Sequence, residues 1–564
     1  MHPPRLKLMS AFRLSAHACL LAVTVTGCDL YERPKLDITE PSRGSIFPAS
    51  DTLQVKISGD SKDLKRVRVN GTEQTPVEGS GSGEHTYILP VASGLNYVSA
   101  SLPDDPYIVT RSWLQGDVVP TSEWYPDTLT IRFSGDILNG DQGSLAHLIE
   151  ASLRAVDLAR FVPLIEIDLG ISSAEIEIES ARVKDVDLKL KVDDQELRVE
   201  VELSRVDLEY RLDSDLLDSS GEGRYSEITA TAEAEIETSG VSLVNLDVDI
   251  SRLNVDDDNL PGYLVDPLID ALRGKFRDAI TQAIIDATRE ITGQLFDQLD
   301  PQLGLALPKP IRQETQLVEV SARNDGLELQ YQTRVSAVSP RIAKSTHGAL
   351  LAAPPQQPSP SEQSAITVGA PLVNQLAFAV WDAGNLEGLS YSRAQLERLG
   401  LGELNFPYSN LERADVKLLL PPIMEWDELG PYIDVGGIQI DIKVDLSKDT
   451  RAWTAARIPV VLQYDAGALR LSPDMSRSIT VQPIMLSRLN VIAERDEVLK
   501  LTRAALPGVV GDVFGRLPLI TIPPLELRVF NETVTFSVTP HVVGAQQRAD
   551  YWRVDFDLMV TQLE

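Results

Sequence analysis

Cysteine and net positive charge are both scarce in this chain. Its 564 residues include two cysteines, Cys19 and Cys28, both near the N-terminus. The rest of the chain therefore offers no disulfide, no thiolate metal cluster and no cysteine nucleophile apart from Cys28. The formal net charge is −31. A surface this negative repels phosphate backbones, so we expect no nucleic-acid partner.

Motifs for catalysis are also missing. The histidines beyond the N-terminus, His85, His147, His347 and His541, lie far apart and match no metal-ligand spacing. The chain contains no P-loop and no dinucleotide fingerprint. Asp256–Asp258 could bind calcium, but the segment lacks the glycine and distal glutamate of an EF-hand loop, so solvation beside a helix start is the favoured interpretation. We predict a protein that is not an enzyme and that holds no metal and no cofactor.

Long apolar runs are absent after residue 28, so we expect no membrane-spanning helix there. The N-terminus itself carries Arg5, Lys7 and Arg13 before an apolar stretch at 14–25, which is too short to cross a bilayer. The segment ends in Val-Thr-Gly-Cys28. This arrangement is similar to a bacterial lipobox, which implies cleavage before Cys28 and acylation of that residue. An ordinary secretory peptide with a chance cysteine is the alternative.

What is abundant is strict alternation of apolar and polar residues. Between residues 161 and 260 there are 27 acidic and nine basic residues, and most of the acids alternate with Val, Ile, Leu or Ala. Such alternation predicts antiparallel strands with one dry and one wet face. Solvated strand faces therefore explain the acidity better than a cation site does. The predicted strands lie at 165–169, 174–178, 186–192, 197–203, 206–210, 228–236 and 246–250.

A long helix follows these strands. Apolar residues recur every three to four positions from Val265 to Leu299, which is the stripe of one amphipathic helix. Asp266 is the expected N-cap and Pro267 the expected first-turn residue, while Asp300 precedes the proline that ends the helix. Such a helix would be roughly 50 Å long. A shorter helix is predicted from Leu145 to Val156.

The chain divides into six segments. We predict a signal peptide at 1–27, a tether at 28–35, an immunoglobulin-like β-sandwich at 36–115 with a hairpin turn at Asn70-Gly71, a first barrel-like unit at 125–336, a Pro/Ser/Gln-rich linker at 337–364 and a second barrel-like unit at 365–564. The first unit ends in a hairpin turning at 324–326. The second unit has helices predicted at 372–380, 396–399 and 494–514, strands predicted at 416–420, 438–446, 458–464 and 469–471, and closing strands at 525–530, 534–538 and 554–560.

Helix, meander, long helix, linker and a second such unit together resemble the tubular lipid-binding superfamily, which includes bactericidal/permeability-increasing and lipopolysaccharide-binding proteins. The likeness rests on Leu260-Pro261-Gly262-Tyr263-Leu264, on 366–384 and on 516–530. It implies an α+β fold of two tandem tubular barrel units, with long helices wrapped on a curved antiparallel sheet, after a small all-β sandwich. The disulfide and the basic tip of the eukaryotic members have no counterpart here.

The resemblance implies a slot for acyl chains between helices and sheet, in which each buried methylene would contribute about 0.8 kcal/mol. We therefore expect a membrane-anchored lipoprotein of the bacterial envelope that faces the periplasm or the cell surface and carries or holds a phospholipid or other envelope lipid without catalysis. The alternative is an envelope scaffold or adhesion lipoprotein with solid domains. The predicted site residues are Cys28 for lipidation and, for lipid contact, Val265, Leu268, Ile269, Leu272, Phe276, Ile280, Ile284, Ile291, Leu295, Leu145, Ile149 and Leu153.

Overall fold

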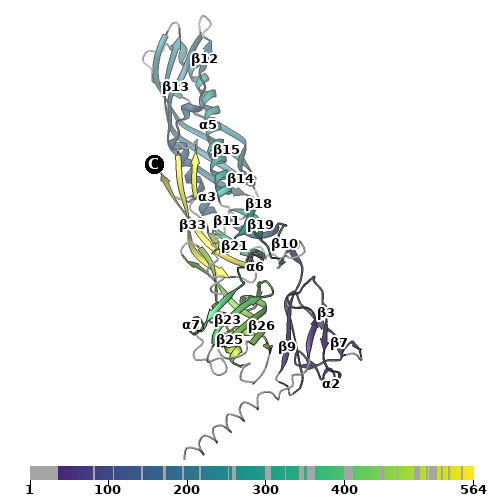
Figure 1. Ribbon diagram of the computed structural model, residues 1–564. Helices are drawn as coiled ribbons and strands as arrows, with labels where there is room; N and C mark the ends of the chain where they lie inside the picture. The colour runs from purple at the N-terminus through teal and green to yellow at the C-terminus, as the bar shows by residue number, and fades with distance from the viewer. Residues whose placement is uncertain are drawn as a thin grey trace, which may run out of the picture.

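A computed structural model shows an elongated molecule (Figure 1). The structure describes residues 36–80, 83–103, 105, 107–140, 144–168, 173–193, 196–214, 217–251, 253–256, 262–298, 307–323, 326–341, 348–351, 363–398, 411–444, 450–465, 468–487, 496–503, 506, 508, 518–521, 525–530, 534–547 and 551–563. Cys28 and the predicted signal peptide and tether lie outside these residues.

The predicted fold class is wrong in its balance of elements. Of the described residues, 59% are in strands and 21% in helices, so the protein is mostly β. One helix is long, and the other helices with both ends described have 13 residues or fewer. Helices do not wrap over the sheets as expected. The alternating pattern that predicted the strands extends further along the chain than the helical pattern does, and it sets the fold class.

The N-terminal module consists of two sheets around a core of its own. One sheet has the order β1 (Asp37–Glu40), β3 (Thr52–Ser58), β7 (Glu84–Pro90) and β6 (Glu78–Ser80). The other contains β2 (Ile46–Phe47), β9 (Ile108–Gln115), β8 (Gly94–Ser101), β4 (Arg68–Val69) and β5 (Thr72–Glu73), and a short helix α2 (Ser61–Leu64) follows β3. Trp113 lies in the core between the sheets. The predicted turn at Asn70 and Gly71 is confirmed, because both residues have positive φ and β4 pairs with β5 across them.

This module packs directly against the second unit. Leu114 of the module shares a small apolar cluster with Leu350, Leu420 and Ile423. The guanidinium of Arg43 lies 4.3 Å from the ring centroid of Trp453. The module is therefore attached along its side, and it is not a free spacer.

The first unit is built on a six-stranded sheet of long strands. Its order is β12 (Ile165–Asp168), β13 (Ser173–Asp193), β14 (Glu196–Ser214), β15 (Leu217–Glu237) and β16 (Gly240–Ile250), with β17 (Leu253–Asp256) paired to β15. The predicted pairs of short strands at 174–192 and 197–210 are each one continuous strand. Residues in β14 alternate between exposed and buried for almost its whole length, which is the pattern that the sequence predicted.

Three helical segments precede or flank this sheet: α3 (Gly135–Asn139), α4 (Leu145–Ala155) and the 3-10 turn η1 (Leu158–Phe161). The prediction of α4 is confirmed, and the Ser144 hydroxyl caps it by accepting from the backbone N–H of His147. The long helix α5 spans Gly262–Gln298. Its start was predicted too late, so Asp266 is not the N-cap, and Pro267 lies inside the helix. Pro267 is the sixth residue of α5, past the first four N–H groups that lack an intrahelical partner, so it removes one backbone hydrogen bond of the helix.

A seven-stranded sheet joins the two units. Its order is β18 (Ile311–Arg323), β19 (Gly326–Ala337), β11 (Tyr125–Phe133), β21 (Ala365–Gly369), β33 (Tyr551–Leu563), β32 (Val534–Gln547) and β31 (Leu525–Val529). Strands β18, β19 and β11 belong to the predicted first unit, and the other four belong to the second. The predicted hairpin at 324–326 is confirmed by the pairing of Arg323 with Gly326. One continuous apolar core runs through both units, so they share a core.

The second unit has a nine-stranded sheet. Its main path is β22 (Leu389–Ser392), β23 (Leu411–Leu418), β25 (Gly430–Val444), β26 (Thr450–Asp465), β27 (Ala468–Pro473) and β30 (Pro518–Thr521), and three strands pair beside it: β24 (Ile423–Asp427), β28 (Thr480–Val481) and β29 (Met485–Leu486). Strand β10 (Val118–Pro120) pairs separately with β20 (Gly348–Leu350).

Helix α6 (Ala370–Asp382) is buried throughout, and α7 (Arg393–Leu396) is one short turn. Of the helix predicted at 494–514, the structure describes a helical run at 496–503. Trp426 of β24 packs on Trp552 of β33 with ring centroids 4.9 Å apart, so the nine-stranded sheet contacts the central sheet here.

Candidate functional site: the apolar interior beside helix α5

The residues predicted to contact lipid lie together in the interior of the first unit. Most of the α5 stripe and all three α4 residues are fully buried, whereas Val265 and Ile269 are half-buried near the helix start. The buried residues are Leu268, Leu272, Phe276, Ile280, Ile284, Ile291, Leu295, Leu145, Ile149 and Leu153. The structure therefore brings these residues into one apolar core, and their contact with lipid stays a prediction.

An apolar cavity lies where the helices meet the central sheet. Its volume is about 10 Å³, and no polar atom contributes to its surface. The lining side chains come from α3, α4, α5 and four strands of the central sheet: Phe133, Ile137, Leu138, Leu145, Leu148, Leu295, Phe296, Leu327, Val538 and Leu558. A space of this size holds about one water molecule at most. The open slot that we predicted is thus closed at this place, and an acyl chain would enter only if the walls moved apart.

Helix α5 lies between two strand edges, those of β16 and β31. On one side it meets β16, where the hydroxyl of Thr292 accepts from the backbone N–H of Val241 at 2.9 Å and Arg273 donates to the carbonyl of Ile250 at 3.0 Å. The two backbones approach closely there. A methyl group added at Gly240 would lie 3.1 Å from the backbone nitrogen of Gly293. Gly293 thus allows this close approach, since a methyl group there would lie 3.2 Å from the carbonyl oxygen of Ser239.

On its other side α5 meets β31 through a ladder of side chains. Gln298 accepts from the N–H of Glu526 and donates to its carbonyl, at 3.2 and 2.8 Å. Gln294 makes the same pair of bonds with Arg528, accepting at 2.8 Å. Glu290 accepts from the N–H of Phe530 at 2.7 Å. These side chains thus take the place of a neighbouring strand.

The ladder works because helix and strand repeats nearly coincide. Four helical residues rise about 6.0 Å, and two strand residues rise about 6.6 Å. Residues 290, 294 and 298 therefore meet alternate residues of the strand edge. Sequence reasoning missed these three residues, although polar side chains four residues apart beside an apolar stripe were a usable indication.

Helix α4 and its flanking turns cover the free edge of β13 in the same way. Glu150 accepts from the N–H of Leu188 at 2.9 Å, and Asn139 accepts from the N–H of Leu190 at 2.6 Å. Further along, Asp157 accepts from the N–H of Ala181 at 2.7 Å. Helices therefore border the six-stranded sheet at both of its edges.

Two buried hydroxyls beside the α5 interior, those of Tyr225 and Thr288, have no hydrogen-bond partner among the described residues. The ring of Tyr225 in β15 packs on Phe276 of α5 with centroids 5.3 Å apart, and its hydroxyl is buried without a hydrogen bond. Burial also raises the pKa of Tyr225 above its usual range. The hydroxyl therefore stays protonated and could donate to a polar group of a ligand.

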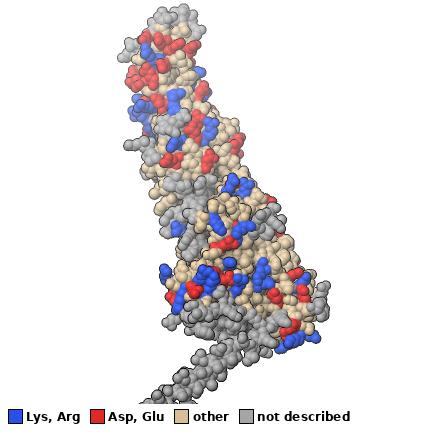
Figure 2. Space-filling model, in the orientation of Figure 1, with Lys and Arg blue, Asp and Glu red and all other residues tan. Residues whose placement is uncertain are grey.

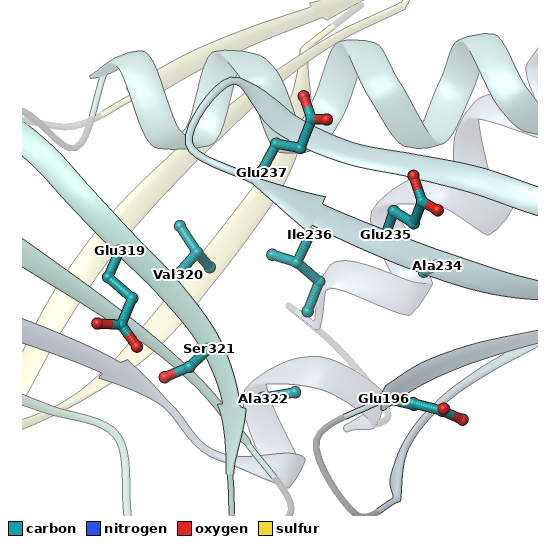
Figure 3. A pocket seen from close by; sticks show the side chains of 9 residues that line it. All are labelled: Glu196, Ala234, Glu235, Ile236, Glu237, Glu319, Val320, Ser321 and Ala322. Carbon is teal, nitrogen blue, oxygen red and sulfur yellow. The ribbon is translucent and has the colours of Figure 1, made fainter.

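A second hollow, of about 500 Å³, lies where strand ends of the six-stranded sheet face β18. Figure 3 shows that the carboxylates of Glu235 and Glu237 point the same way, while those of Glu319 and Glu196 lie apart from them, with Ile236 and Val320 between Glu319 and Glu235. The acidic residues are Glu196, Glu235, Glu237 and Glu319. Because they do not converge on a point, they cannot jointly ligate an ion. No group of three possible metal ligands is found among the residues that the structure describes.

Acidic and basic side chains are mixed on the visible face of the first unit (Figure 2). Asp207 pairs with both Arg224 and Lys184, at 2.6 and 3.8 Å, and Lys191 pairs with Glu200 at 2.7 Å. These residues occupy the exposed positions of the alternating strands. This placement agrees with the interpretation of the acidic region as solvated strand faces.

A titratable cluster that the sequence did not indicate lies where the second unit meets the N-terminal module. Burial, and secondarily the charge of Asp434, raises the pKa of Glu425 to about 7. Tyr432 donates to Glu425 at 2.9 Å, and Arg457 binds Asp434 through two bonds of 3.0 and 2.9 Å. Glu425 also abuts Gly94 of the module.

No helix in the described part of the chain is both long enough and apolar enough to cross a bilayer. No family description matches the sequence, and no curated protein matches it. Among solved structures, a lipopolysaccharide-binding protein is similar, with 13% identity, a TM-score of 0.41, and coverage of 77% of this chain and 99% of that chain.

P47 of Clostridium botulinum E1 is similar at 9% identity and a TM-score of 0.24, covering 77% of this chain and all of that chain. P47 from Clostridium botulinum A2 gives 10% identity and a TM-score of 0.25, with 78% and 98% covered. Likeness at these values concerns the fold alone and carries no conclusion about function.

Proposed function

We propose that this protein binds the acyl chains of a membrane lipid in the interior of its first unit. It would do so as a member of the tubular lipid-binding superfamily, and it would carry or hold that lipid without catalysis. The supporting observation is the cavity bounded by α3, α4, α5 and the central sheet, whose lining is entirely hydrocarbon. A chain entering it would gain about 0.8 kcal/mol for each methylene removed from water.

The cavity is small in this conformation, so binding requires the walls to separate. Two of these walls are helices that meet the strand edges through side-chain bonds, whereas neighbouring strands are joined by regular backbone ladders. A helix held in this way can shift while the sheets stay paired. We place the headgroup at the rim, because the cavity lining offers it no polar partner.

We also propose that Cys28 is acylated and holds the protein on a membrane of the bacterial envelope. The apolar stretch at 14–25 followed by Val-Thr-Gly-Cys28 supports this. A Cys28→Ser variant should then move from the membrane fraction to the soluble fraction. Membrane retention of that variant, with no fatty acid found on the wild-type N-terminus, would remove the anchor from the proposal.

A second candidate function is a scaffold lipoprotein with a solid core. The close packing favours it: Leu272, Ile280 and Ile291 have no exposed surface. Native mass spectrometry of gently purified protein, followed by lipid extraction, distinguishes the two. A co-purifying lipid supports the lipid-binding function, and an apo mass under gentle conditions supports the scaffold.

A pair of variants on one strand sharpens this test. Val538 lines the cavity, whereas Val543, also in β32, is 55% exposed. Val538→Phe should fill the cavity and lower the co-purified lipid, at a folding cost of about 1–3 kcal/mol. Val543→Phe should leave the lipid content unchanged. Circular dichroism would confirm that both variants are folded, and equal lipid content in two folded variants would contradict the proposed site.

A further inference from the structure

Helix α5 is held differently along its two sides, and this difference is the basis of the inference. Towards β16 the bond from Val241 to the hydroxyl of Thr292 is buried, and the backbones of Gly240 and Gly293 are in close contact. Towards β31 the four bonds of Gln294 and Gln298 are exposed to solvent. Water can replace exposed bonds when they open, so each adds only about 0.5–1.5 kcal/mol to the barrier.

The apolar cavity lies directly behind the exposed side. Leu295 and Phe296, next to Gln294 on α5, line it from the helix. Val538 lines it from β32, and its partner across the ladder is Leu525 of β31. Glu526, the next residue of β31, is bonded by Gln298. Separation of α5 from β31 would therefore expose this cavity to the outside.

Strand β31 is also suited to a temporary contact. Among the described strands it pairs with β32 alone, so its other edge depends on the side chains of α5. The bond from Phe530 to Glu290, at 2.7 Å, is partly buried and closes the inner end of the ladder. The outer end, at Gln298, is the end of the described helix.

We propose that the seam between α5 and β31 is the entrance through which an acyl chain reaches the cavity. Helix α5 pivots on its contact with β16, the Gln294 and Gln298 bonds exchange with water, and the chain passes between helix and strand. This inference rests on the proposed lipid binding, and it adds the route and the residues that gate it.

Cross-linking tests the entrance. In a Cys19→Ser, Cys28→Ser background, Gln298→Cys and Glu526→Cys would be joined by a short bis-maleimide reagent. The matched control joins Arg273→Cys and Asp249→Cys on the other side of α5, where the wild-type residues form an exposed ion pair of 3.8 Å. The readout is the initial rate at which pyrene-labelled phosphatidylglycerol leaves phosphatidylethanolamine/phosphatidylglycerol vesicles for the protein.

The cross-link across the entrance should slow uptake by about tenfold or more, which corresponds to about 1.4 kcal/mol in the barrier. The control cross-link should leave the rate within about twofold. If the first cross-link does not change the rate of uptake, the proposed entrance is wrong, while the proposed lipid binding still holds. If the protein without a cross-link takes up no lipid, both the proposed function and the proposed entrance are wrong.

Weakening the side-chain bonds between α5 and β31 should raise the rate of lipid uptake, whereas the cross-link lowers it. Gln294→Ala with Gln298→Ala should speed uptake severalfold, because fewer bonds must open. Gln282→Ala on the same helix removes an exposed bond of 2.9 Å to Asp286 that does not involve β31, so it should not change the rate. Equal rates for the two variants would contradict the entrance.

Discussion

The hydroxyl of Tyr432 donates to the carboxylate of Glu425 at 2.9 Å, beside Arg457, where the second unit meets the N-terminal module. The guanidinium carbon of Arg457 lies 3.7 Å from the ring centroid of Tyr432. Asp434 is buried in the same cluster. The contact between module and unit thus includes a carboxyl group that titrates near neutral pH.

The stability of the protein should therefore fall as pH rises through this range. The pKa of Glu425 is raised from 4.5 to about 7 in the fold, so the folded state binds the proton more tightly than the unfolded state. The contribution of Glu425 to the free energy of unfolding is complete below pH 4.5 and is lost as the pH rises to about 7, by at most about 3–4 kcal/mol. Glu425→Gln should flatten this dependence and stabilise the protein at pH 8, measured by thermal unfolding across pH. An unchanged pH profile in the variant would contradict the assignment.

A substitution at Gly94 should loosen the module from the second unit. Gly94 has φ +104°, and a methyl group there would overlap the carboxylate of Glu425. Gly71 is a matched control, since it has φ +80° and no atom within 4 Å of an added methyl. Gly94→Ala should enlarge the radius of gyration in small-angle scattering, while Gly71→Ala should only lower the melting temperature. The same radius for both variants would count against a close contact.

Removing the hydroxyl of Tyr225 should cost little. The atom is buried without a partner among the described residues, so Tyr225→Phe should be neutral or should stabilise by up to about 1 kcal/mol. Tyr225→Ala should destabilise by about 3–5 kcal/mol, because it leaves a cavity against Phe276. Chemical denaturation measures both. A clear loss of stability in Tyr225→Phe of lipid-containing protein, but not of delipidated protein, would show that the bound lipid pairs with the hydroxyl.

Thr292→Val should weaken the side of α5 that we take as fixed. The Thr292 hydroxyl accepts from Val241 N–H and donates to the carbonyl of Thr288 at 2.7 Å, all within the buried interior. Valine keeps the shape and leaves the Val241 N–H unpaired, at a cost of about 1–3 kcal/mol. Hydrogen exchange should then accelerate at Val241 more than at Arg528. Equal acceleration at both would mean that α5 has no fixed side.

Local patterns in the sequence predicted much of the fold. The alternation in β14 placed its inward side chains correctly, and the stripe of α5 placed residues such as Phe276 and Ile284 in the core. Strand lengths were underestimated, because a bulge between Ile178 and Ser180 in β13 interrupts the pattern without ending the strand. The start of α5 was missed because a proline normally marks the first turn.

The sequence by itself determined which residues face inwards, since a period of two or of 3.6 follows from backbone geometry alone. Only the tertiary structure decided which strand edges α5 closes and which strands share the central sheet. The bond between Gln294 and Arg528 joins residues 234 positions apart, and β11 pairs with both β19 and β21. Such contacts depend on where distant edges with unpaired N–H and C=O groups meet in space, and no local pattern of residues encodes that meeting.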